Sequence, residues 1–238
     1  MLSRGNIMKS FVKMLVLTLC AFLLFSCATA PKNEETEKAD DGSMTAEEIS
    51  YINDTTARHL LQNDVEKDNE ILRKVSAPAK LGTEGYDVLE KFMLESLGTG
   101  VGIAAPQVGI NRRVIMVQRF DKEEKPFEFF YNIEIKKTYG EKVVGWEGCL
   151  SIPAGYGQVE RWQDIDIEYD AEVDGKIVRK SENIKGFTAV IFQHETDHLN
   201  GILFIDKKTN DPLMTAEKYR EMRMKEKAEK EAKEQNKE

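Results

Sequence analysis

The stretch Gln193-His194-Glu195-Thr196-Asp197-His198 contains two histidines four residues apart, with a glutamate directly after the first. On a helix, positions i and i+4 lie on one face, so both imidazole rings can reach a single metal ion. Glu195 would then lie beside the ion, where a carboxylate can move a proton to or from water. Apolar residues precede the motif at 190–192, and buried His and Glu are costly unless they are paired or metal-bound. The pattern therefore predicts a buried helix with a metal site. The alternative is a structural helix whose polar groups are satisfied within the protein.

The composition limits the number of domains and the kinds of partner. The chain has 238 residues and a formal net charge of −8. Its two ends do not have a globular composition, whereas roughly residues 60–208 fit one domain of ordinary size. The negative charge argues against a general role in binding nucleic acid. We expect a single folded domain that is a monomer and has no nucleic-acid partner.

The first residues have the pattern of an export signal. Three basic residues precede an apolar run over residues 14–25, which is the arrangement of a signal peptide. The run is too short to favour a membrane span, which needs about 20 apolar residues. It leads into Leu24-Phe25-Ser26-Cys27-Ala28, which resembles a lipoprotein cleavage box, although Phe25 is bulkier than the usual residue there.

This pattern predicts a lipoprotein-like signal segment over residues 1–27, with Cys27 as the lipidated first residue of the mature chain. The protein would then be a membrane-anchored lipoprotein of the cell envelope. The alternatives are a cleaved secretory signal, an uncleaved short anchor, or a true start at Met44. The last alternative would leave the protein in the cytoplasm.

The segments on either side of the domain are polar. Residues 28–50 are low in aromatic residues and are expected to form a flexible polar tether. The domain itself is expected over residues 51–208. Residues 209–238 form a charged helical tail, because residues 216–238 are rich in Glu, Lys and Ala and favour an exposed helix. A partner-binding tail is the alternative for this segment.

Hydrophobic periodicity and turn residues predict an α+β fold in which helices flank a set of antiparallel strands; the family resemblance described below implies antiparallel β-sheets around a central HExxH helix. Alternation over residues 164–169 is typical of a half-buried strand, and Asp174-Gly175 is a good hairpin turn. We expect helices over residues 47–62, 85–97 and 187–200, a short extended segment over 71–75, and strands over 113–118, 127–135, 142–146, 164–169 and 176–180.

Cys149 is the only cysteine of the domain, because the other two lie in the N-terminal segment. It follows a glycine in Glu147-Gly148-Cys149-Leu150-Ser151-Ile152-Pro153, near the end of a predicted strand. As a thiolate it would complete a Cys-His-His ligand set with a fourth position open for water, which is the catalytic pattern. The alternative is a buried core cysteine. His59 is a conceivable fourth ligand, but we expect it at the surface.

A glycine-rich segment, GVGIAAPQVG, occupies residues 100–109. It lacks the Lys-Ser/Thr ending of a phosphate-binding loop, so a phosphate site is not indicated. Its glycines would let the backbone approach a bound substrate closely. Gln107 offers a neutral amide that can stabilise an oxyanion. The alternative is a tight structural loop with a surface glutamine.

GVGIAAPQVG, EGCLS and QHETDH, in this order, resemble the three signature motifs of peptide deformylases. The resemblance runs from about residue 70 to about residue 206 and so covers the domain. It implies an α+β fold and a divalent metal ion held by Cys149, His194 and His198. Ferrous iron is the usual metal of the family, and Ni²⁺, Co²⁺ or Zn²⁺ can substitute. Ligand chemistry alone would favour zinc.

The resemblance also implies an activity, the removal of the formyl group from N-formylmethionyl peptides with release of formate. Glu195 would transfer the proton, while the Gln107 side chain and the Leu150 N–H would stabilise the charge on the formyl oxygen. The implied substrate-binding residues are three glycines that flank the substrate and four apolar residues that line a methionine pocket: Gly100, Gly102 and Gly148, and Val101, Phe187, Val190 and Ile191.

The resemblance implies an ion pair between Glu147 and Arg161 that holds the cysteine loop. The sequence also departs from the family. Gly155-Tyr156 stand where some members have an arginine, so the contact to the peptide backbone beyond methionine differs. The leader is a second departure, since deformylases act on nascent chains in the cytoplasm. An exported ferrous-thiolate site would face oxidation, which implies an anaerobic habitat or another metal.

Two other functions are compatible with parts of the sequence. One is an HExxH metallopeptidase that cleaves ordinary amides, against which the cysteine ligand and the lack of a carboxylate third ligand argue. The other is a non-catalytic lipoprotein that retains the deformylase fold, against which the intact set of chemical groups argues.

Overall fold

The structure, a computed structural model, describes residues 40–235. The predicted signal segment, Cys27 and residues 28–39 of the predicted tether lie outside the described residues. Among the helices of residues 40–235, none is both long enough and apolar enough to span a bilayer.

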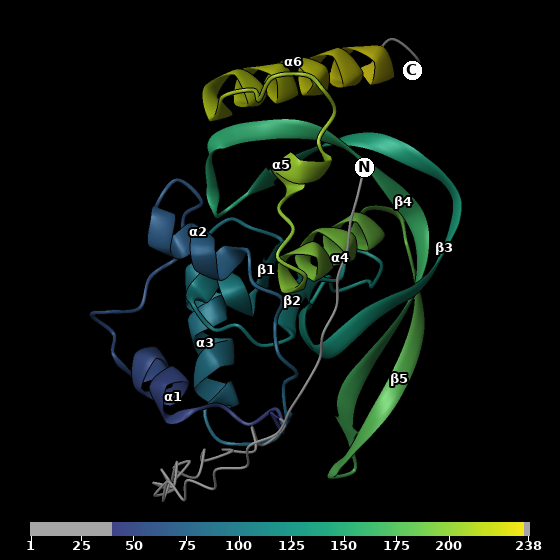
Figure 1. Cartoon of the computed structure of the whole chain (residues 1–238). Coiled ribbons are helices and arrows are strands. Elements are labelled where there is room, and N and C mark those ends of the chain that lie inside the picture. Colours follow the sequence, from purple (N-terminus) through teal and green to yellow (C-terminus); the bar gives the residue numbers. More distant parts are fainter. Residues whose placement is uncertain (1–39, 236–238) are drawn as a thin grey trace, which may run out of the picture. The chain divides into compact units, whose positions relative to one another are not determined.

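Five strands form one antiparallel sheet in which each strand pairs with its neighbours in the sequence (Figure 1). The predicted strands at 127–135 and 142–146 are parts of one long strand, β3, which continues through a register shift near Gly140. Such shifts bend a strand without ending it. Together with the helices, the sheet confirms the predicted α+β class. The strands are β1 (Gly102–Ala104), β2 (Val114–Gln118), β3 (Phe127–Cys149), β4 (Ile152–Val173) and β5 (Lys176–Lys185).

Two tight hairpins fix the register of β4. At its C-terminal end, Asp174 and Gly175 both have positive φ, of 50° and 73°, as the favoured two-residue hairpin turn requires. The predicted turn is therefore confirmed. At its N-terminal end, Cys149 pairs with Ile152 across a two-residue connection. Cys149 is thus held at the tip of the β3–β4 hairpin by the sheet itself.

Helix α4 (Gly186–Leu199) contains the HExxH motif and contacts every strand of the sheet. In Figure 1 it lies within the curve of β3 and β4. Phe192 packs edge-on against Phe130 of β3, with ring centroids 4.7 Å apart, a favoured aromatic geometry. The chain turns away after the helix at Gly201, where a Cβ would lie 2.3 Å from the carbonyl oxygen of Arg73. The predicted helix over 187–200 is confirmed.

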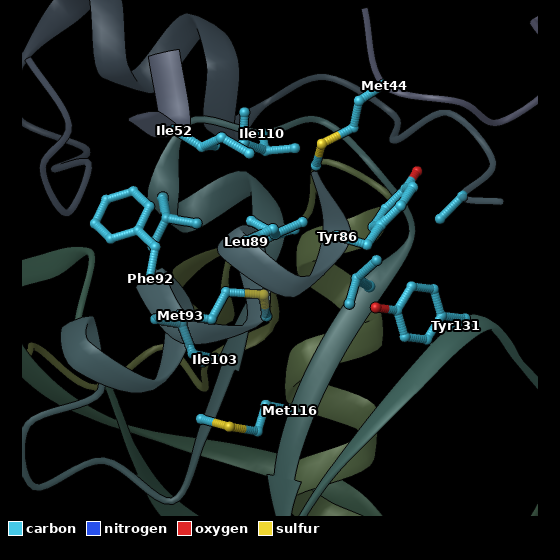
Figure 2. Packing of buried hydrophobic residues seen from close by; sticks show 14 of the residues in the cluster. Met44, Ile52, Tyr86, Leu89, Phe92, Met93, Ile103, Ile110, Met116 and Tyr131 are labelled. Atoms are coloured by element: carbon cyan, nitrogen blue, oxygen red, sulfur yellow. The ribbon is translucent and has the colours of Figure 1, made fainter. Parts of the chain in front are cut away.

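Three helices and a short 3₁₀ helix cover the glycine-rich strand β1. They are α1 (Ala46–Asn53), α2 (Glu66–Leu72), α3 (Tyr86–Ser96) and η1 (Ala105–Val108). Figure 2 shows buried side chains that join α1 and α3 to β1, with Leu89 and Met93 of α3 between Ile52 and Ile103. This core supports β1 and η1 from behind, and the predicted helix over 85–97 is confirmed. Leu72 of α2 instead packs in a separate cluster with Leu61 and Ile152.

Two predicted elements near the N-terminus are wrong. The predicted helix 47–62 ends at Asn53, because the Asp54 carboxylate accepts hydrogen bonds from the backbone N–H groups of Thr56 (2.9 Å) and Ala57 (3.2 Å). This local turn competes with further helix. The predicted extended segment 71–75 begins inside α2, which runs to Leu72.

The predicted tether over residues 28–50 is too long at its C-terminal end. Residues 40–50 are part of the fold, since Met44 is buried and α1 begins at Ala46. Arg112, which is 3% exposed, binds Asp40 at 2.6 Å and Glu48 at 2.9 Å. A buried guanidinium needs such partners, and no local pattern marks them because they lie more than sixty positions away from Arg112.

The C-terminal segment contains α5 (Phe204–Lys207) and α6 (Ala216–Gln235). No residue of α6 is fully buried, so the predicted exposed helix is confirmed as far as Gln235. Tyr219 of α6 nevertheless contacts the sheet, because its ring stacks on the Tyr156 ring of β4 with centroids 3.9 Å apart. The first turn of α6 is therefore docked on the sheet.

Candidate metal centre

Cys149, His194 and His198 come together although β3 and α4 are far apart in the sequence. One ligand atom of each lies within 4.8 Å of the others. Cys149 Sγ is 3.2 Å from His198 Nε2, and the two imidazole rings lie 5.1 Å apart on the same side of α4. The i, i+4 spacing and the hairpin tip together produce this cluster.

The cluster fits a transition-metal ion. A thiolate and two imidazoles are donors that such ions prefer. His194 Nδ1 lies 2.9 Å from Glu147 Oε2, an arrangement that leaves Nε2 for a metal, as in most metal-binding histidines. His198 Nδ1 has no hydrogen-bond partner within residues 40–235. No fourth His, Cys, Asp or Glu joins the three there, so the ligand set leaves a position open.

The pKa values of the two histidines are shifted in opposite directions. Burial lowers the pKa of His198 well below its usual value, and the charges on His194 and Arg161 act in the same direction. Burial also opposes the charged form of His194, but hydrogen bonds with Cys149 and Glu147 outweigh it and raise the pKa of His194 well above its usual value. Metal ligands must be unprotonated, so an ion at this cluster would compete with protonation of His194.

Glu195 lies beside the cluster and is almost completely buried. Its Oε2 has no hydrogen-bond partner within the described chain. Burial raises the pKa of Glu195 to about 7, which suits a group that both accepts and donates a proton near neutral pH. A Cβ on Gly102 of β1 would lie 2.5 Å from Glu195 Oε1, so only glycine lets this carboxylate take its place.

Gln107 is buried in η1, which rules out the alternative of a surface glutamine. Its Oε1 accepts a hydrogen bond from the Ala104 N–H at 2.9 Å. The amide nitrogen is consequently turned toward the cluster, 3.2 Å from Ser151 Oγ and 3.5 Å from Cys149 Sγ. A fixed N–H donor next to the ligands can stabilise negative charge that develops there.

A network of ion pairs, most of it buried, supports the metal ligands. Arg161 donates to Glu147 at 2.7 Å and to Asp197 at 2.5 Å, and Lys207 reaches Asp197 at 2.6 Å. Burial alone would raise the pKa of Glu147, but hydrogen bonds with Arg161 and His194 outweigh this effect and lower the pKa to about 2. The implied pair of Glu147 and Arg161 is therefore present, and it extends through Asp197, which sequence reasoning left without a role although it lies inside the HExxH motif.

Replacing Arg161 by methionine is expected to destabilise the fold by about 3–5 kcal/mol, because Glu147 and Asp197 would be left as buried charges without a partner. Metal affinity should also fall about 10–100-fold, since Glu147 orients His194. Urea unfolding and metal titration measure the two effects. Arg179→Met is the matched control, because the ion pairs of Arg179 are half-exposed and such pairs contribute about 1 kcal/mol or less. Equal effects of the two substitutions would refute this account.

A cavity of about 530 Å³ opens beside the cluster. It contains Cys149, His194, Glu195, Gln107 and Leu150, while His198 lies buried behind. All seven residues predicted to contact substrate line it: Gly100, Val101, Gly102, Gly148, Phe187, Val190 and Ile191. The structure thus brings every predicted site residue to one place.

Sequence reasoning missed part of the cavity wall. Trp146, Tyr156 and Tyr219 also line it. Tyr156 was noted only as a departure from the family pattern, and Tyr219 lies in a segment whose charge predicted a solvated helix. No periodic signal in the sequence connects these three aromatic residues.

Comparison with known proteins gives a consistent result. Residues 62–212 match the family model described as polypeptide deformylase. The chain is 38% identical over 147 residues to a peptide deformylase of Desulforudis audaxviator, which covers 61% of this chain and 92% of that one.

Solved structures that resemble this one also belong to peptide deformylases. A peptide deformylase of Thermotoga maritima superposes with a TM-score of 0.55 at 32% identity, covering 64% of this chain and 97% of the other. A peptide deformylase of Acinetobacter baumannii, solved with Met-Ala-Ser bound, gives 0.53 at 34% identity, covering 63% and 96%.

Proposed function

The chain belongs to the polypeptide deformylase family of hydrolases, which remove the N-formyl group from peptides, and we propose that Cys149, His194, His198 and Glu195 form its active centre. The observation that carries this proposal is the convergence of three metal donors at the wall of one cavity that Glu195, with its unpaired carboxylate oxygen, and Gln107 also line. Members of this family are metalloenzymes, and the three donors fit one ion.

Ferrous iron is the proposed metal, on the basis of the family resemblance, with Ni²⁺, Co²⁺ and Zn²⁺ as substitutes. When bound, a divalent ion at these ligands acts as a Lewis acid and lowers the pKa of a water molecule toward neutrality. A ferrous ion and a thiolate ligand are both open to oxidation, so the protein should be handled without oxygen.

Glu195 is the proposed proton carrier. Its carboxylate accepts a proton from the attacking water and passes it to the nitrogen of the leaving amine. The products are formate and a peptide with a free amino terminus. The unpaired Oε2 of Glu195 and its pKa near 7 support this role.

Gln107 and Leu150 are the proposed oxyanion donors. The Gln107 side-chain N–H groups are fixed by the Ala104–Oε1 hydrogen bond, so they need no reorganisation when charge develops on the formyl oxygen. Gln62 donates to the carbonyl oxygen of Leu150 at 3.1 Å, which holds the hairpin tip and with it the Leu150 N–H.

The substrate is held by backbone and by apolar side chains. Gly100, Gly102 and Gly148 line the cavity and are the proposed contacts of the peptide backbone. Four apolar residues of the cavity form the proposed methionine pocket: Val101, Phe187, Val190 and Ile191. An unbranched thioether side chain suits such a surface.

The test is formate release from formyl-Met-Ala-Ser by protein purified without oxygen and assayed for metal. We expect stoichiometric formate and Met-Ala-Ser, and no cleavage of a blocked peptide with only internal amides. Cleavage of internal amides would indicate a metallopeptidase. A metal-loaded protein that releases no formate from any formyl peptide would indicate a non-catalytic binding protein.

The chain is further proposed to be exported, held at the cell envelope by a lipidated Cys27, and monomeric. The basic and apolar leader and the residues around Cys27 support export and lipidation. Fractionation of cells should recover the protein with membranes, and a Cys27→Ser variant should leave the membrane fraction. Recovery of both forms in the cytosol would instead favour a start at Met44. Size-exclusion chromatography tests the monomer.

A further inference from the structure

The outer wall of the cavity is aromatic. Tyr156 of β4 stacks on Tyr219 of α6 with centroids 3.9 Å apart and planes 10° from parallel. Trp146 of β3 lies 5.9 Å from the same Tyr219 ring. All three residues line the cavity together with Cys149 and His194. Three elements thus contribute one ring each to a continuous surface, here called the aromatic wall (Trp146, Tyr156 and Tyr219).

The aromatic wall is rigidly attached to the sheet. Tyr156 and Met214 exchange two backbone hydrogen bonds, both of 2.8 Å. Gly155 has φ of +129° and its Cβ would lie 2.2 Å from the Met214 carbonyl oxygen, so only glycine permits this approach. Thr209 adds a hydrogen bond to Gln158 of 2.8 Å. The segment before α6 therefore fixes where Tyr219 lies, whereas the rest of α6 has no buried residue.

The aromatic wall also lies next to the reacting centre. A Cβ on Gly148 would be 2.4 Å from the Tyr156 ring, and Gly148 directly precedes the ligand Cys149. A substrate held at the metal centre must pass this ring when its chain leaves the cavity on that side. Tyr219 itself lies beyond residues 62–212, the part of the chain that matches the family model.

The charge around the cavity restricts what the aromatic wall can bind. No lysine or arginine is among the described residues that line it, and its acidic groups, Glu147 and Glu195, belong to the centre. The wall therefore offers ring faces rather than ionic partners. Ring faces bind apolar and above all aromatic side chains through stacked or edge-on contacts.

We infer that Tyr219, with Tyr156 and Trp146, determines specificity for the residues that follow methionine, and that it selects peptides with aromatic side chains there. This inference rests on the proposed function of the same site. Methionine occupies the apolar pocket of β1 and α4, and the next residues lie against the aromatic wall.

The test compares kcat/KM for formyl-Met-Phe-Phe with that for formyl-Met-Ala-Ala, using the full-length, metal-loaded protein. We expect the wild-type protein to prefer the aromatic peptide. In Tyr219→Ala the ratio of the two values should fall about tenfold, because one stacked ring contributes an affinity of that order. Tyr219→Phe keeps the ring and should keep the ratio. Met224→Ala is the control on the same helix, since Met224 is 69% exposed.

A binding measurement separates this inference from the proposed function. Met-Phe-Phe, the deformylated product, is titrated into each variant by calorimetry, which needs no turnover. Tighter binding of Met-Phe-Phe than of Met-Ala-Ala that is lost in Tyr219→Ala would support the aromatic wall even if no formate were released. An unchanged ratio in Tyr219→Ala, by kinetics or by binding, would overturn the inference and leave the proposed function intact.

Discussion

Replacing Glu195 by glutamine is expected to lower kcat/KM for formyl-Met-Ala-Ser by about 10²–10⁴-fold, the contribution of a positioned proton carrier. Glutamine has the same shape and fills the space against Gly102, so fold and metal content should not change. Formate release and metal analysis on the same preparation measure both properties. The expected result is a fully loaded protein that hydrolyses slowly.

The control for this substitution is Glu160→Gln, which removes an exposed carboxylate from β4. It should retain the wild-type rate. A Glu195→Gln variant that keeps more than about a tenth of the wild-type kcat/KM would refute the proposed role, since proton transfer is expected to contribute at least about 10²-fold.

The pH profile gives a second readout of the same substitution. Burial raises the pKa of Glu195 to about 7, and the base is the unprotonated form, so kcat/KM should fall as pH decreases through the pKa. A bound divalent ion favours the carboxylate, which moves this limb to lower pH in the loaded enzyme. Glu195→Gln should abolish the limb.

Replacing Cys149 by alanine is expected to abolish both metal binding and activity. The loss of affinity should exceed the roughly 10–100-fold that follows when only a hydrogen-bond partner of a ligand is removed. His198→Ala should have the same effect, because His198 is the second ligand in contact with Cys149 Sγ. Metal analysis after dialysis, followed by the formate assay, measures the two losses.

His59→Ala provides the matched control, because the His59 side chain is 57% exposed and contacts Asp68 and the Ala57 carbonyl oxygen rather than the metal ligands. It should retain the metal and the rate. A Cys149→Ala protein that still carries one tightly bound ion would show that the metal is held elsewhere, and the account of the centre would then be wrong.

Only part of the centre could be predicted from local geometry. The spacing of His194 and His198 fixes their common face on any helix, whereas the approach of Cys149 to them, from more than forty positions away, was implied by the family resemblance. The Asp174-Gly175 turn was as local as the histidine spacing, since both residues adopt the positive φ that the turn requires. In these two local cases a few adjacent residues determine the conformation.

The errors and omissions arise from contacts between distant residues. Asp40 joins the fold because Arg112 is buried and needs a partner. The helix after Ala46 stops early because the Asp54 side chain competes for backbone N–H groups. Tyr219 lines the cavity because Met214 pairs with Tyr156. None of these partners is marked by periodicity or composition.

The central claim is that one sulfur and two imidazole nitrogens hold a single ion with one position left for solvent. X-ray absorption spectroscopy at the metal edge, on protein purified without oxygen, tests it most directly. The account predicts one sulfur, two imidazole nitrogens and one exchangeable light atom around the ion. A coordination shell without sulfur, or one closed by four protein ligands, would contradict it.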